Sequence, residues 1–123
     1  MKLFVVLGSL NAFLAVALGA FGAHGLKSKV SVEMLTVWQT GVQYHMFHAL
    51  GLILLGILIH LLPQIGQLRL SGWLLFSGII LFSGSLYVMV LSGVRVLGMV
   101  TPIGGMTFLL GWLLIAFFVS RNL

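Results

Sequence analysis

The chain has 123 residues, of which 61% are hydrophobic and only 6% are charged. Soluble domains carry roughly a quarter charged residues, so this composition excludes an ordinary soluble domain and predicts a membrane protein. The positive residues behind the net charge of +5 are scattered along the chain without a basic run, so nucleic-acid binding is not expected. The lack of cysteine excludes disulfides. Because Glu33 is the single Asp or Glu, catalysis by paired carboxylates is also excluded.

The pattern predicts one all-α domain over residues 1–123, a four-helix transmembrane bundle. Its first span is predicted over residues 3–23, which is long enough to cross about 30 Å of hydrocarbon. Lys2 also suits a signal peptide, but the long apolar run and the three spans that follow favour an uncleaved helix. Asn11 is expected to bond to a neighbouring helix, and Gly25 to end the helix in a left-handed conformation. Small residues spaced for close helix packing are Gly8, Ala12, Ala15 and Gly19.

Ser31 is a predicted N-cap, followed by Glu33 in the first helical turn. Residues 31–43 predict an amphipathic segment lying at the membrane interface, with Trp38 and Tyr44 at headgroup level. The second span is then predicted over residues 44–62, where Pro63 stops it.

The third span is predicted over residues 72–91, with Trp73 and Tyr87 as interfacial anchors and with Gly78 and Gly84 suited to helix packing. Thr101 and Pro102 predict an N-cap and first helical residue for a fourth span over residues 103–119. Short loops predict antiparallel neighbours and both termini on one side. Lys and Arg residues are then tied at three on each side: Lys2, Arg69 and Arg121 against Lys27, Lys29 and Arg95.

Three of the four histidines and the only acidic residue lie between residues 31 and 62. At about 100° per residue, one helical face carries Glu33, Thr40, Tyr44, His45 and His48. We expect these side chains to form a polar layer near one membrane face, with Arg95 facing Glu33 or a lipid headgroup. The other members expected at this level are His24, Tyr87 and Thr101.

Several interpretations of this layer remain open at this stage. The side chains of Tyr44, His45 and His48 form either a hydrogen-bonded seam between helices or the wall of a polar cavity that binds another molecule. A metal site would use His24, His45 and His48. A haem could take only a single histidine ligand here, because two residues on one helical turn cannot provide both of its axial ligands. A proton path from Glu33 to His48 is a further alternative. No cofactor is assigned by the sequence.

Four motifs carry a resemblance to a known family: Gly19–Leu26, Trp38–Leu50, Phe82–Tyr87 and Thr101–Gly105. They resemble, in order and spacing, the small membrane-protein family catalogued as domain of unknown function 423, whose eukaryotic relatives are called transmembrane protein 256. The resemblance covers the whole chain. It implies a four-helix protein of the bacterial plasma membrane with no established activity and no agreed catalytic residues. The lack of a transit peptide favours the bacterial setting.

We therefore expect a non-enzymatic membrane protein that binds a lipid, a small apolar ligand or a partner membrane protein. A transporter or channel component with a polar path along Glu33–His48 is the alternative, but the aliphatic run over residues 52–59 speaks against it. The small-residue strips also predict self-association into a homo-oligomer.

Overall fold

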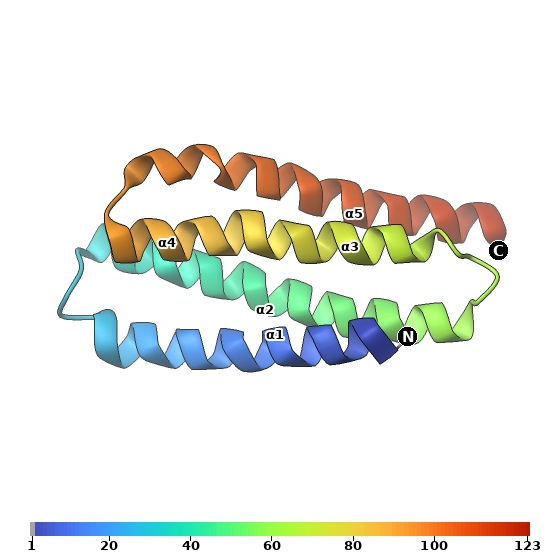
Figure 1. Ribbon diagram of the computed structural model, residues 1–123, viewed down its shortest axis with the longest axis horizontal. Helices are drawn as coiled ribbons and strands as arrows, with labels where there is room; N and C mark the ends of the chain where they lie inside the picture. The colour runs from blue at the N-terminus through green and yellow to red at the C-terminus, as the bar shows by residue number, and fades with distance from the viewer. Residues whose placement is uncertain (1) are drawn as a thin grey trace.

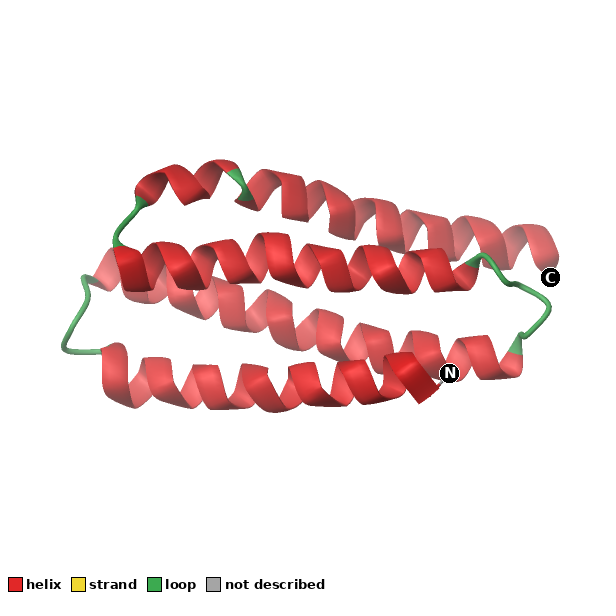
Figure 2. Cartoon of the chain, viewed as in Figure 1, coloured by secondary structure: helices red, strands yellow, loops and turns green. Residues whose placement is uncertain are grey.

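The computed structural model describes residues 2–123, which form four long antiparallel helical segments joined by short loops (Figure 1 and Figure 2). All four are long and apolar enough to cross a membrane, so the predicted four-helix transmembrane fold is confirmed. The first segment is α1 (Lys2–Phe21) with a π-helical turn η1 (Gly22–Leu26), and the second is α2 (Val32–Leu61). The third comprises α3 (Leu68–Gly78), a π-helical stretch η2 (Ile79–Gly84) and α4 (Ser85–Ser92); the fourth comprises a 3₁₀ turn η3 (Arg95–Met99) and α5 (Thr101–Asn122).

The segments have unequal positions in the bundle. Helix α2 and the segment from α3 to α4 are central, whereas α1 packs along α2 and α5 packs along α3 and η2 (Figure 1). The most hydrophobic windows of the two central segments are each 44% buried, against 22% for the first segment and 17% for the fourth. The outer helices therefore present most of their surface to the membrane. Both ends of the chain lie at the end of the bundle that holds the α2–α3 loop (Figure 1).

Several helix boundaries follow local sequence signals. The backbone N–H of Met34 donates to Ser31 Oγ at 3.1 Å, which confirms the predicted N-cap, and α2 ends two residues before Pro63. Two expectations were wrong. Gly25 is not left-handed, because η1 continues the helix to Leu26. Thr101 is the first residue of α5 rather than its N-cap, a position that Val100 takes because η3 leads directly into the helix.

Residues 32–43 form the first turns of α2, which is one continuous helix of 30 residues and runs along the bundle from its start. Their expected position at the membrane interface stays a prediction. Trp38 is only 1% exposed and its Nε1–H donates to the carbonyl of Leu18 at 2.8 Å. Its ring packs in a small core with Leu26 and Val90, so the indole is buried between helices and not exposed to lipid headgroups. The predicted interfacial anchor Tyr87 likewise turns inward, against Trp38.

The small residues of α1 face α2. A Cβ at Gly8 would lie 2.6 Å from the backbone oxygen of Ala49, Ala15 is fully buried, and a Cβ at Gly19 would lie 3.2 Å from Val42. Such contacts allow the two helix backbones to approach closely.

The other residues predicted to lie at close helix contacts are Gly78, Gly84 and Ala12, and they differ in what they touch. Gly78 receives the ring of Phe108 from α5. A Cβ at Gly84 would meet only the carbonyl oxygen of Ile79 in its own segment, at 3.9 Å, so Gly84 does not lie at a close helix contact. Ala12 is half-buried.

Candidate functional site

The polar side chains of the bundle gather at mid-height. His45 and His48 lie close to the midpoint of α2, Asn11 close to the midpoint of α1, and Trp112 close to that of α5. The sequence predicted the histidines near one membrane face, whereas in the structure they lie midway along α2 and therefore midway along the bundle. Polar groups at this depth have no water to satisfy them, so each one needs a protein partner.

One hydrogen-bonded chain crosses the bundle through His45. Asn11 Nδ2 donates to the Leu7 carbonyl at 2.8 Å, which leaves Asn11 Oδ1 as the acceptor for His45 Nε2–H at 2.9 Å. His45 Nδ1 is then the acceptor for the Tyr87 hydroxyl at 3.0 Å. The chain ties α1, α2 and α4 together, and it confirms the expectation that Asn11 bonds to a neighbouring helix.

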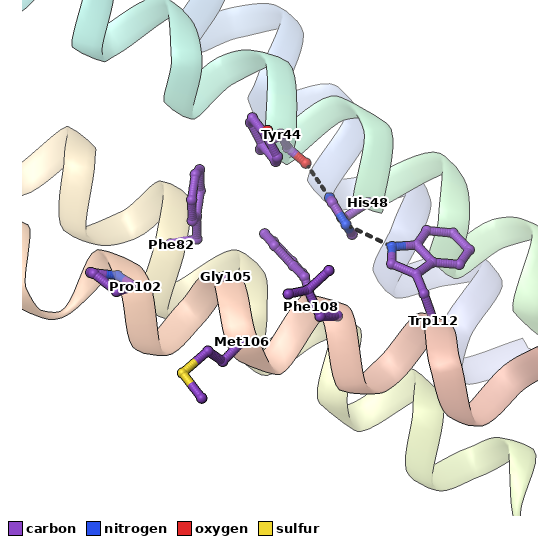
Figure 3. Close-up of a pocket in the computed structure, with 9 residues that line it drawn as sticks. Tyr44, His48, Phe82, Pro102, Gly105, Met106, Phe108 and Trp112 are labelled. Carbon is purple, nitrogen blue, oxygen red and sulfur yellow. Dashed lines mark hydrogen bonds between the residues drawn. The ribbon is translucent and has the colours of Figure 1, made fainter.

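A second cluster joins α2 to α5 through His48 (Figure 3). Trp112 Nε1–H donates to His48 Nε2 at 2.9 Å, and His48 Nδ1–H donates to the backbone carbonyl of Tyr44 at 2.7 Å. The imidazole also stacks on Phe108 with ring centroids 3.5 Å apart. All four ring nitrogens of His45 and His48 therefore have protein partners.

Hydroxyl groups add further links around the layer. Ser83 Oγ donates to the carbonyl of Gly41 at 2.7 Å, and the hydroxyls of Ser85 and Thr101 lie 2.7 Å apart. The hydroxyl of Thr40 donates to a carbonyl of its own helix. Ser71 Oγ is buried without a partner among the described residues.

Three predicted site residues lie at the end of the bundle instead. Glu33 and Arg95 form the expected ion pair at 2.9 Å, but both side chains are 67% exposed. His24 is exposed and lies on η1, about 20 Å along the first helical segment from Asn11 at 1.5 Å per residue. The expectation that His24 shares the depth of His45 was therefore wrong, because α2 runs back along the bundle from Val32 and reaches His45 only after 13 residues.

The same geometry separates the three histidines considered for metal binding. Within residues 2–123 no group of three His, Asp or Glu side chains comes together. His24 is remote, and the lone pairs on the imidazoles of His45 and His48 accept hydrogen bonds from Tyr87 and Trp112.

A groove of about 480 Å³ lies between α2 and α5 beside His48 (Figure 3). It is open toward the membrane, since Tyr44 is 40% exposed and Met106 and Leu109 are about 70% exposed. A smaller cavity of about 260 Å³ continues along the same two helices, and the indole of Trp112 borders both. The groove is lined by Tyr44, His48, Phe82, Pro102, Gly105, Met106, Phe108, Leu109 and Trp112.

The α5 side of this groove was missed by the sequence analysis. Gly105, Phe108 and Trp112 recur every three or four residues and so share one helical face, which is a readable signal. Their pairing with α2 was not readable, because Trp112 reaches His48 by lying over Gly51, where a Cβ would be 2.9 Å from its ring.

The fold and this mid-membrane layer define a small multi-pass membrane protein built as a four-helix bundle. The chain belongs to the family described as Protein of unknown function (DUF423), which matches residues 18–105, as the sequence motifs predicted. Among similar relatives, the UPF0382 membrane protein YwdK of Bacillus subtilis is 53% identical over 115 residues, covering 94% of each chain.

The UPF0382 membrane protein SSP2132 of Staphylococcus saprophyticus is 49% identical, again over 94% of each chain. SERP0230 of Staphylococcus epidermidis, also named a UPF0382 membrane protein, is 50% identical over 94% of this chain and 93% of its own. No solved structure matches the chain significantly. These bacterial relatives agree with the predicted location in a cell membrane.

Proposed function

We propose that this protein is a non-enzymatic membrane protein that binds a lipid-soluble molecule in the groove between α2 and α5. The observation that carries the proposal is the groove itself, about 480 Å³ in volume and lined by aromatic rings around one imidazole. This volume falls within the range of about 300–1,000 Å³ that is typical of small-molecule sites. The groove lies at mid-height, so its occupant comes from the hydrocarbon phase.

The position of His48 supports this proposal over a purely structural role. Ionisable side chains at membrane depth are costly, and they usually face the interior of a bundle or a cavity that serves function. His45 has the first environment, between three helices, whereas His48 lies at the wall of the groove. His45 thus ties three helices together, whereas His48 lies beside the groove in which we propose that the ligand binds.

The same contacts weigh against catalysis and transport. The single carboxylate, Glu33, pairs with Arg95 at the end of the bundle, far from the imidazoles. A transport path would need polar groups beyond His48, but α2 contributes Leu52, Leu55 and Ile59 to the hydrophobic core there. Proton flux into proteoliposomes that is lost in a His48→Ala variant would reverse this ranking.

Filling the groove tests the proposal. A Cβ at Gly105 would lie 3.8 Å from the Phe82 ring, so the backbone there accepts a side chain, and Gly105→Leu places four carbon atoms in the groove. Ala17→Leu adds comparable bulk to an exposed position on α1 and is the matched control.

The measurement is the amount of each lipid-soluble molecule that remains bound to protein extracted into nanodiscs, determined by mass spectrometry. We expect a molecule retained by the wild type and by Ala17→Leu to be lost from Gly105→Leu. Equal retention by all three proteins would overturn the proposal.

Self-association is also proposed, through surfaces other than the small-residue strips. The glycines on α1 and Gly78 on the third segment face neighbouring helices of the same chain. An oligomer would therefore use the membrane-exposed sides of α1 and α5, where Phe13, Leu109 and Leu113 are 66–71% exposed. A monomeric mass in nanodiscs and in several mild detergents would contradict this proposal.

A further inference from the structure

We propose that the α2–α5 groove selects a long-chain alcohol, whose hydroxyl group replaces the indole of Trp112 on His48. This inference rests on the proposed function and names the chemical class of its ligand. It follows from the hydrogen-bonding roles of the His48 ring and from the position of Trp112 between two cavities.

The two protein partners of His48 fix which ring nitrogen carries the proton. The backbone oxygen of Tyr44 can only accept, so His48 Nδ1, at 2.7 Å, carries the hydrogen. The indole of Trp112 can only donate, so Nε2, at 2.9 Å, is the acceptor. The lone pair of His48 Nε2 is therefore held by Trp112, and any group that takes the place of Trp112 has to bring a hydrogen-bond donor.

This requirement discriminates among the molecules that dissolve in a membrane. An ester, ether or ketone has only acceptor oxygens, so it cannot replace Trp112 on Nε2 without leaving two lone pairs facing each other. An alcohol donates its O–H to Nε2 and restores the bond that Trp112 made. Rejection of a ligand through an unpaired buried group is stronger than rejection through shape alone.

Trp112 is placed so that its movement would extend the groove. Its side chain is 43% exposed and lies across the crevice between α2 and α5, over Gly51. On one side is the aromatic groove of about 480 Å³, and on the other is the cavity of about 260 Å³ lined by leucines and Ile115. Rotation of the indole toward the membrane would join the two spaces, giving an imidazole for the hydroxyl and an aliphatic channel for the chain.

The test uses hexadecan-1-ol and its methyl ether as probes; the ether has a methyl group in place of the hydroxyl hydrogen and so lacks the hydrogen-bond donor. Radiolabelled probe bound to the protein in phosphatidylcholine nanodiscs is measured against empty nanodiscs. The NMR resonance of the Trp112 indole N–H reports on the bond between Trp112 and His48. This resonance is identified by its absence from the spectrum of Trp112→Phe. We expect the alcohol to bind about tenfold more tightly than the ether, the value of one buried hydrogen bond, and to shift the Trp112 signal alone among the three tryptophans.

Two variants separate this inference from a general apolar site. His48→Phe keeps a ring against Phe108 but removes the acceptor, and it should bind alcohol and ether equally. Trp112→Phe removes the competing donor, and it should bind the alcohol more tightly than the wild type does.

The outcomes distinguish the two proposals. Equal binding of alcohol and ether that Gly105→Leu abolishes, with the Trp112 signal unshifted, would overturn the selection of an alcohol while the proposed binding function stands. Binding of neither probe, or binding that Gly105→Leu leaves unchanged, would count against both.

Discussion

His45 is the side chain on which three helices converge. Its imidazole donates to Asn11 from α1 and accepts from Tyr87 on α4, and it is only 4% exposed. Removing the ring would leave an amide oxygen and a phenol hydroxyl inside the bundle without partners. In the membrane interior no water replaces such bonds, so the loss falls on the stability of the fold.

The residue-scale prediction contrasts two histidines of the same helix. We expect His45→Ala to lower the free energy of unfolding by about 1–3 kcal/mol, the cost of leaving buried polar groups unpaired. His60→Ala should change it by less than about 0.5 kcal/mol, because His60 is exposed near the end of α2. Denaturation in mild detergent, followed by loss of helical circular dichroism, measures both, and equal midpoints for His45→Ala and the wild type would contradict the prediction.

The residue types of this layer could be predicted from the sequence, but most of its partners could not. Polar residues within apolar helices predict interior hydrogen bonds, and this reasoning anticipated the role of Asn11. The bonds between His45 and Tyr87 and between His48 and Trp112 depend on how each helix rotates about its axis. That rotation is set by contacts such as Gly51 with Trp112, which one sequence does not reveal.

At the scale of elements, α5 rests directly on the π-helical stretch η2. A Cβ at Gly104 would lie 2.7 Å from the carbonyl carbon of Leu81 and closer still to the backbone nitrogen of Phe82. Backbone atoms cannot rotate away as a side chain does, so any larger residue at this position would push the two helices apart. The neighbouring Gly105 has no such contact and faces the groove.

Adjacent glycines therefore give a matched pair of variants. We expect Gly104→Ala to destabilise the protein by about 1–3 kcal/mol through overpacking. Gly105→Ala should be neutral or stabilise it by up to about 1 kcal/mol, since alanine favours a helix more than glycine does. Thermal unfolding in detergent compares the two, and a Gly104→Ala protein as stable as Gly105→Ala would show that α5 and η2 are not in firm contact.

The number of helices was predicted correctly. In the first turns of α2, the hydroxyls of Thr36 and Thr40 donate to carbonyls of their own helix at 3.0 Å, which satisfies these groups without a partner from another helix. The π-helical turns η1 and η2 have no sequence signature comparable to proline or an N-cap, so the extension of the first helix past His24 was unforeseen.

For the whole molecule, the ends of the bundle differ in charge only slightly. The end with the chain termini carries Lys2, Arg69 and Arg121, and the opposite end carries Lys27, Lys29 and the pair of Arg95 with Glu33. That ion pair is too exposed to stabilise the fold much, so we expect Glu33→Gln to change the free energy of unfolding by less than about 1 kcal/mol. Unfolding at low and high salt would detect a larger contribution.

The last prediction concerns the orientation of the bundle in the membrane. Positive residues are tied at three for each end, and acidic residues contribute little to orientation, so a change of two charges should decide it. The chain has no cysteine, which allows single cysteines at Ser28, Gln67 and Asn122 to report on the two ends through a membrane-impermeant maleimide on intact cells. All three positions are exposed. We expect Gln67→Cys and Asn122→Cys to react alike and Ser28→Cys to react oppositely, because four antiparallel spans put Gln67 and the C-terminus on one side.

One of two paired variants, Lys27→Ala with Lys29→Ala or Arg69→Ala with Arg121→Ala, should then exchange the two labelling patterns, since the end that keeps more positive charge stays in the cytoplasm. A labelling pattern that neither pair alters, or one that places Ser28 and Gln67 on the same side, would contradict this account of the bundle in its membrane.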